Sequence, residues 1–149
     1  MSLQLHNLRF SYGSGFELHV PELVIQPGES IALVGPSGSG KTTLLNLVAG
    51  ILRPDQGTIL LGDQCLTDLS SRSWRQLRLG SIGMIFQSFE LLHYLNVVEN
   101  VMLPMDFCRV HRKRERQQRA LALLESVGLA DQAHKLPSTL SGGEQQRVA

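Results

Sequence analysis

One stretch of eight residues has the residue types and spacing of a phosphate-binding loop. Residues 35–42 read GPSGSGKT and satisfy the pattern G-x-x-x-x-G-K-S/T. Such a loop solvates the dense charge of a polyphosphate with successive backbone N–H groups and with the positive end of the following helix. Lys41 would add a full positive charge against the β- and γ-phosphates, and the Thr42 hydroxyl would be available to Mg²⁺.

The glycines of this loop permit backbone dihedrals and a close approach of ligand that a Cβ atom would block. The alternative is a glycine-rich strand-to-helix turn with an incidental lysine. The preceding apolar run at 31–34, typical of a strand covered on both faces, and the leucine-rich stretch 42–49 favour the phosphate loop. The candidate phosphate-binding residues are Gly35, Pro36, Ser37, Gly38, Ser39, Gly40, Lys41, Thr42 and Thr43.

A second candidate anion site lies at residues 140–147, which read LSGGEQQR. Ser141 and Glu144 have the S-x-x-E spacing of a capping box, which predicts that a helix begins here. Gly142 and Gly143 leave its first N–H groups uncovered by side chains, and such a helix end attracts anions. A well-capped structural helix is the alternative, because capping boxes are common.

These motifs together resemble the ATP-binding-cassette (ABC) ATPases, over the chain from its first strand to its last residue. The resemblance rests on GPSGSGKT, on Gln87 isolated after a strand, and on LSGGEQQR. Residues 81–104 are similar to the ATPases of lipoprotein-releasing and macrolide-exporter complexes. The resemblance implies ATP and Mg²⁺ as cofactors, Tyr12 stacked on adenine, and Gln87 with Thr42 beside the metal. The alternatives are a hairpin aromatic packed on its strand and a surface glutamine.

The same resemblance implies partners. Ser141, Gly142, Gly143 and Glu144 would contact ATP held by the loop of a second subunit, so that a homodimer forms composite sites. The leading hypothesis is the motor subunit of a membrane export or lipoprotein-extraction complex, peripheral on the cytoplasmic face beneath integral membrane subunits, with no nucleic acid expected. The alternatives are a nucleic-acid-handling ABC ATPase, which would carry zinc modules or coiled coils between the motifs, and a nucleotide-binding fragment without activity.

Hydrolysis in this class also needs an apolar strand ending in an acidic residue for Mg²⁺ and a group that orients water. Family members place both, with a switch histidine, after the signature helix. Asp63 precedes a loop that lacks a second acid, and the run ending at Asp106 contains Pro104, which a central strand cannot accommodate. We therefore expect a chain truncated after the signature motif, with no catalytic residue and inactive by itself, although the intact protein is an ATPase.

The elements that must position these motifs follow from apolar periodicity. Alternation predicts two antiparallel strands at 3–10 and 16–20 around a glycine-rich turn. Further strands are expected at 31–34, 58–61 and 81–86. Helices are expected at 42–49, 71–79, 97–103 and 109–127, with Pro104 ending the third and Gly128 closing the fourth.

The fold class predicted from this order is α/β: a P-loop NTPase core with a mostly parallel sheet, an antiparallel β N-terminal part and a helical insertion. The expected boundaries within 1–149 are a nucleotide-binding core at 1–87, a helical subdomain at 88–140 and the start of the signature helix at 141–149. Apolar residues crowd the segment immediately after Gln87, where docking of a membrane subunit competes with core packing as the explanation. They are Phe89, Leu91, Leu92, Tyr94 and Leu95.

Composition and charge set the remaining limits. The 149 residues, 42% of them hydrophobic, suit one globular domain or part of one. No apolar run approaches the roughly 18–20 residues of a bilayer span, so we expect a cytoplasmic chain. Cys65 and Cys108 lack metal-ligand spacing and are interpreted as buried small hydrophobes. Six of the 14 basic residues lie between 109 and 119, which suits either a solvated helix face or contact with anionic lipid headgroups.

Overall fold

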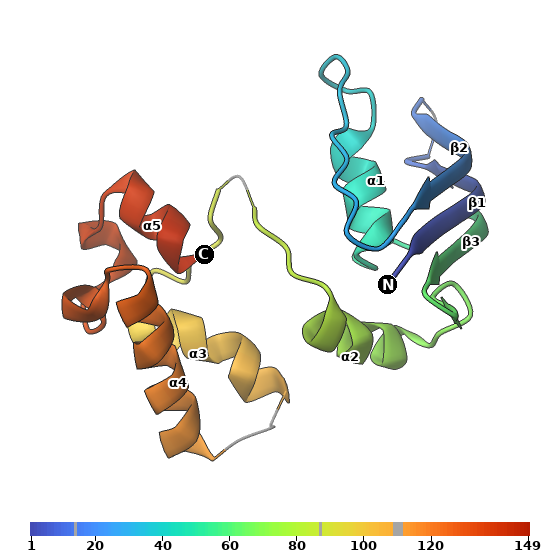
Figure 1. Cartoon of the computed structure of the whole chain (residues 1–149). Helices are drawn as coiled ribbons and strands as arrows, with labels where there is room; N and C mark the ends of the chain where they lie inside the picture. The colour runs from blue at the N-terminus through green and yellow to red at the C-terminus, as the bar shows by residue number, and fades with distance from the viewer. Residues whose placement is uncertain (14, 87, 109–111) are drawn as a thin grey trace. The chain divides into compact units, whose positions relative to one another are not determined.

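The computed structural model describes residues 1–13, 15–86, 88–108 and 112–149. They form two compact units, Met1–Ile82 and Gly83–Ala149, and each unit has its own hydrophobic core (Figure 1). Gln87 and the basic residue Arg109 lie outside the described residues. Among the described helices, none combines the length and the apolar character needed to cross a membrane.

The first unit is built on an antiparallel sheet with the strand order β2-β1-β3-β4. The central strand β1 (Leu3–Ser11) pairs with β2 (Glu17–Ile25) on one edge and with β3 (Gln56–Leu61) on the other. The short β4 (Gln64–Cys65) continues from β3. The predicted antiparallel opening is therefore confirmed, and its second strand is longer than expected.

A bulge in β1 explains why two leucines at an odd spacing both point to the core side of the sheet. Leu5 and Leu8 are both fully buried although they lie three positions apart, because the register with β3 shifts between His6 and Arg9. Asn7 has a φ of 47°, and the opposite Gly57 approaches so closely that a Cβ there would lie 2.4 Å from the Asn7 carbonyl oxygen. An extra residue in one strand keeps both leucines on the core face.

Two helices complete the first unit. Leu44 and Leu47 of α1 (Lys41–Val48) join Leu5, Leu8 and Ile59 in the core. The next helix, α2 (Ser71–Ser81), begins after Ser70, whose hydroxyl accepts a hydrogen bond from the Ser73 amide at 3.1 Å. Gly50 ends α1 with a φ of 68°, and a Cβ there would meet the buried Trp74 ring of α2 at 1.8 Å. Both helices were expected from the sequence.

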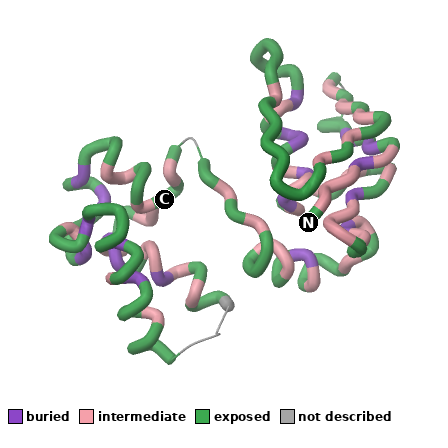
Figure 2. The backbone as a smooth tube through the Cα atoms, viewed as in Figure 1, coloured by how far each residue is buried: buried purple, intermediate pink, exposed green. Residues whose placement is uncertain are grey.

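The strands expected at 31–34 and 81–86 do not form among the described residues. Neither segment belongs to the sheet, and residues 26–39 are exposed apart from Leu33 (Figure 2). A strand requires a neighbour to satisfy its backbone N–H and C=O groups, and the described sheet consists of antiparallel strands that pair with one another. The α/β class with an antiparallel N-terminal part holds, whereas the parallel pairing is absent from the described strands.

The second unit is helical. Its core gathers residues from α3 (Val97–Cys108), α4 (Lys113–Ser126), the loop that follows and the entry to α5 (Gly142–Val148). Single 3-10 turns, η1 (Ala130–Gln132) and η2 (Pro137–Thr139), shape that loop. The buried residues of this core are Val97, Val98, Met102, Ala120, Leu124, Leu129, Ala133 and Leu140.

Pro104 does not end the third helix, contrary to the prediction. The helix α3 continues through it to Cys108. Pro104 removes the N–H that the Asn100 carbonyl would accept, but its ring is exposed and water can reach the freed carbonyl. The last turn is also held by a salt bridge in which Arg116 Nε of α4 lies 2.6 Å from Asp106 Oδ1. Contacts from a second helix therefore outweigh the local preference.

Candidate functional site

The loop before α1 has the backbone of an anion cradle. Gly38 and Gly40 have φ values of 82° and 91°, which glycine adopts without strain. No side chain caps the helix and no acidic residue occupies its first turn. The first N–H groups of α1 are thus available to an external anion.

Gly40 is required for a second reason. A Cβ atom at this position would lie 2.9 Å from Phe16 Cζ and 3.2 Å from Leu18 Cδ1. Both side chains belong to the β1–β2 hairpin or its turn, so the loop packs directly against that hairpin. An alanine here would meet an unfavourable φ and a steric clash together.

Lys41 points into the loop rather than into solvent. Its Nζ donates hydrogen bonds to the carbonyl oxygens of Gly35 at 2.8 Å and Pro36 at 2.7 Å. A third, longer hydrogen bond of 3.4 Å reaches Ser39 Oγ. The ammonium group is therefore placed inside the ring of backbone atoms where the spacing of the motif predicts a bound phosphate.

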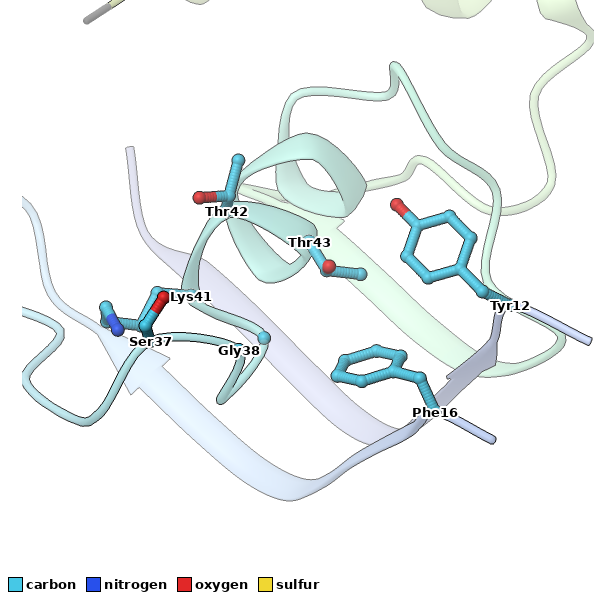
Figure 3. Close-up of a pocket in the computed structure, with 8 residues that line it drawn as sticks. Tyr12, Phe16, Ser37, Gly38, Lys41, Thr42 and Thr43 are labelled. Carbon is cyan, nitrogen blue, oxygen red and sulfur yellow. The ribbon is translucent and has the colours of Figure 1, made fainter. Parts of the chain in front are cut away.

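A cavity of about 400 Å³ adjoins the loop. Figure 3 shows two aromatic rings on one side of it and the loop with the start of α1 on the other. Tyr12 is 54% exposed, and its ring centroid lies 5.7 Å from that of Phe16 and 4.7 Å from that of Phe10. The lining residues are Tyr12, Phe16, Ser37, Gly38, Gly40, Lys41, Thr42 and Thr43.

Phe16 also lines the cavity, although it was not predicted as a site residue from the sequence. Its backbone carbonyl accepts a hydrogen bond from the Tyr12 amide at 3.2 Å, which closes the turn between β1 and β2. The signal in the sequence was a pair of aromatics flanking a glycine-rich turn, of which only Tyr12 was selected. A flat aromatic ligand group and a phosphate chain can both contact this cavity, because rings and backbone amides face it from different elements.

The donors available for a metal are few. No group of three or more His, Cys, Asp or Glu side chains is placed to hold a metal ion within the described ranges. Thr42 is exposed and lines the cavity, so its hydroxyl is a hard oxygen ligand beside the phosphate loop. Mg²⁺ commonly takes one or two protein oxygens and completes its shell with phosphate and water, which this arrangement fits. The other expected ligand, Gln87, lies outside the described residues.

The capping box at the start of α5 forms as predicted. Glu144 Oε2 accepts hydrogen bonds from the Ser141 amide and hydroxyl, both at 2.7 Å, and the Glu144 amide donates to Ser141 Oγ at 3.3 Å. The side-chain and backbone hydrogen bonds from Ser141 hold the pKa of Glu144 below its usual range. Because this exchange occupies the Ser141 and Glu144 amides, Gly142 and Gly143 carry the N–H groups left for an outside anion.

This second motif belongs to the helical unit, whereas the phosphate loop belongs to the first unit. The backbone before α5 is braced by Gln145, whose Nε2 donates to the carbonyls of Pro137 at 3.0 Å and Leu140 at 3.2 Å. Ser141, Gly142 and Gly143 are exposed. The structure thus presents the motif as an ordered, accessible helix start.

The helical unit also contains an apolar cavity of about 490 Å³. Phe89 and Leu91 line it together with Val101 and Leu103 of α3. Asn100 fixes the segment before α3, since its side chain accepts from the Leu92 amide at 2.8 Å and donates to the Leu92 carbonyl at 3.1 Å. Of the five apolar residues noted after Gln87, Tyr94 is 77% exposed, so this segment is only partly used by the core.

Comparisons with known proteins identify the family. The sequence model of the family described as ABC transporter matches residues 18–149. The uncharacterized ABC transporter ATP-binding protein YknY of Bacillus subtilis is 44% identical over 151 residues, which cover 99% of this chain and 65% of the relative. The macrolide export ATP-binding/permease protein MacB 2 of Aeromonas hydrophila is 44% identical over 99% of this chain and 23% of its own length.

Solved structures give the same result for the fold. The ATP-binding cassette MJ0796, in a dimeric post-hydrolysis state bound to ADP and Pi, superposes with a TM-score of 0.85 and 35% identity over 98% of this chain and 66% of that protein. A second dimeric structure of MJ0796 gives a TM-score of 0.84. The chain therefore spans about 65% of the length of a curated relative.

Proposed function

The chain belongs to the ABC transporter ATPase family, and on that premise we propose that it is the nucleotide-binding part of a motor subunit that drives a membrane export or lipoprotein-extraction complex. The observation that carries this proposal is the cavity in which a lysine-centred phosphate loop faces an aromatic pair. Phosphate and base recognition are then combined in one site on the first unit.

In this proposal ATP binds with its adenine against Tyr12 and its phosphates in the loop. The backbone N–H groups of the loop, apart from Pro36, and of the start of α1 donate hydrogen bonds to the phosphates. Lys41 exchanges its hydrogen bonds with the Gly35 and Pro36 carbonyls for phosphate oxygens. Thr42 and Gln87 hold Mg²⁺, which would neutralise charge on the phosphates. This loop is built to bind ATP whether or not hydrolysis follows.

The Tyr12 assignment can be tested by separating base from phosphate. Replacing Tyr12 with Ala should weaken Mg-ATP binding by an amount of order 1 kcal/mol, the contribution of one aromatic contact, while tripolyphosphate binding stays unchanged. Calorimetry on the intact protein would measure both. Equal losses for the two ligands, or no loss for either, would remove Tyr12 from the adenine site.

We further propose that two copies complete each other's sites. Ser141, Gly142, Gly143 and Glu144 of one copy would contact the ATP held by the loop of the other, mainly through the free amides of Gly142 and Gly143. The dimeric state of the MJ0796 structures supports the pairing of two copies. The Ser141–Glu144 cap would keep these amides aligned before the nucleotide arrives.

Coupling to membrane subunits is assigned to the segment 88–107 and the apolar cavity beside it. Phe89 and Glu90 have φ values of 60° and 51°, which are uncommon for residues other than glycine and concentrate at switch regions. They lie two and three positions after Gln87 in the chain, so a change that Gln87 senses at the γ-phosphate would reach this strained segment early. The intact protein would then lie on the cytoplasmic face, against its membrane partner.

Hydrolysis is assigned to the intact protein and not to residues 1–149 alone. Asp63 stands in the turn between β3 and β4 and does not line the cavity beside the phosphate loop, and the Asp106 carboxylate is already paired with Arg116 at 2.6 Å. We expect a protein made only of residues 1–149 to bind nucleotide weakly and to release no phosphate from Mg-ATP above a Lys41→Ala control. Release above that control would require an acidic metal ligand within these residues, and Asp63 or Asp106 would have to be re-examined.

A further inference from the structure

The end of the α3–α4 hairpin carries basic and aromatic side chains that neither the core nor the nucleotide site uses. We define the hairpin tip as Phe107, Arg112, Lys113 and Arg114. All four residues are exposed, and Phe107 is 67% exposed at the last turn of α3. We propose that the hairpin tip binds the surface of an anionic lipid bilayer.

Two basic residues of the hairpin tip lie at a position that is unfavourable for helix stability. Lys113 and Arg114 occupy the first turn of α4, next to the positive end of the helix dipole, where acidic residues are stabilising and basic ones are not. In the described part of the chain, no ion pair or side-chain hydrogen bond holds either of them. Their positive charge is thus available to a ligand.

The neighbouring charged residues do serve the fold. Arg116 Nε lies 2.6 Å from Asp106 Oδ1, with only 17% of the arginine side chain exposed. Glu115 Oε2 accepts a hydrogen bond from the Arg112 amide at 3.1 Å and so caps α4. The Asp106–Arg116 pair ties the last turn of α3 to the first turn of α4. The C-terminal end of α3 and the N-terminal end of α4 therefore lie at the same end of the hairpin (Figure 1).

An anionic membrane fits this combination better than nucleic acid or an acidic protein does. Basic side chains are attracted to the negative surface potential of a cytoplasmic leaflet, and an adjacent aromatic ring can enter the interface. Cations without fixed partners suit a diffuse layer of headgroups, whereas a specific protein contact favours defined geometry. A net charge of +1 over the chain provides no broad field for nucleic acid.

Membrane binding by the hairpin tip rests on the proposed function, which places the intact protein at the cytoplasmic face of a membrane. The test uses lipid vesicles and no membrane protein. The intact protein, purified without membrane subunits, would be sedimented with vesicles of phosphatidylcholine alone or with phosphatidylglycerol added. We expect binding only to the anionic vesicles, weakening as salt shortens the range of electrostatic attraction. Failure of this binding would leave the ATP-driven motor function untouched.

The decisive variant is the double charge reversal Lys113→Glu and Arg114→Glu. Each basic residue at an anionic surface strengthens binding about fivefold, so we expect the double variant to bind at least about thirtyfold more weakly. Glutamate in the first turn favours a helix, so α4 should remain folded, which circular dichroism and nucleotide binding would verify. The matched control is Arg72→Glu with Arg75→Glu, the same charge change near the start of α2, which should bind as the wild type does.

The Phe107→Ala variant tests the apolar contribution to vesicle binding separately from the charges. Its exposed ring contributes little to the core, and its removal should weaken vesicle binding several-fold even at high salt. Equal binding of the wild type and the double variant to anionic vesicles would overturn the proposal. It would also be overturned if the wild type ignored the vesicles while the double variant failed to assemble with its membrane subunits, because the tip would then contact protein.

Discussion

At the scale of single residues, Lys41 would link the closure of the loop to the anion binding that we propose for it. Its ammonium group bridges the carbonyls of Gly35 and Pro36, so the same charge that would meet phosphate also keeps the loop closed around it. An anion entering the loop exchanges with these carbonyls. The free energy of anion binding would then be the difference between the hydrogen bonds that Lys41 makes to phosphate and those that it gives up to the two carbonyls.

Replacing Lys41 with Ala should weaken Mg-ATP binding about ten- to a hundredfold, because one charge-assisted hydrogen bond contributes roughly 1.5–3 kcal/mol. Calorimetry on the intact protein measures the change. Lys135→Ala is the matched control, since this exposed lysine lies outside the loop, its backbone makes its hydrogen bonds, and its charge acts on Glu144. Unchanged affinity in Lys41→Ala would refute the assignment of the loop.

At the scale of elements, the start of α5 depends on a charged cap. Hydrogen bonds from Ser141 lower the pKa of Glu144, so the folded state binds this proton less readily than the unfolded state does. The stabilisation is fully present above the ordinary Glu pKa of about 4.3 and is lost as the pH falls through the lower folded value. The helix start should therefore weaken in acid.

The corresponding prediction compares Glu144→Gln with the wild type in thermal unfolding as a function of pH. We expect the variant to be less stable than the wild type at pH 7, because only the charged carboxylate accepts both Ser141 hydrogen bonds at full strength. This difference in stability should vanish when the pH falls below the folded-state pKa of Glu144. Glu125→Gln, the same substitution at an exposed position of α4, is the matched control. A Glu144 carboxyl that titrates at its ordinary pKa by NMR would contradict the prediction.

At the scale of the whole molecule, composite sites predict that two defective copies can restore each other. Lys41→Ala disables the loop, and Ser141→Arg blocks the exposed start of α5, so each variant alone should lack ATPase activity in the intact protein. A mixed dimer contains one intact loop facing one intact signature, so mixing the variants should recover a substantial fraction of one site's activity. Mixtures that stay as inactive as the separate variants would argue against sites shared between copies.

The phosphate loop, the α5 cap and the antiparallel opening could all be predicted from the sequence. Each depends on residues that are close in the chain: Gly38, Gly40 and Lys41 act within one loop, and Ser141 reaches Glu144 across three positions. Conformational freedom of glycine and short-range hydrogen bonding are local properties. Local patterns are therefore sufficient to locate these parts of the site.

Other features were decided by partners distant in sequence. Phe16 becomes part of the cavity because its hairpin packs against Gly40, and Pro104 is tolerated because α4 supplies Arg116 to the last turn of α3. The apolar run at 31–34 reads as a strand, yet a strand exists only where a neighbour pairs with its backbone. The sequence alone determined the loop before α1 and the cap of α5, whereas the tertiary structure decided which elements surround them, because packing and strand pairing are properties of two segments at once.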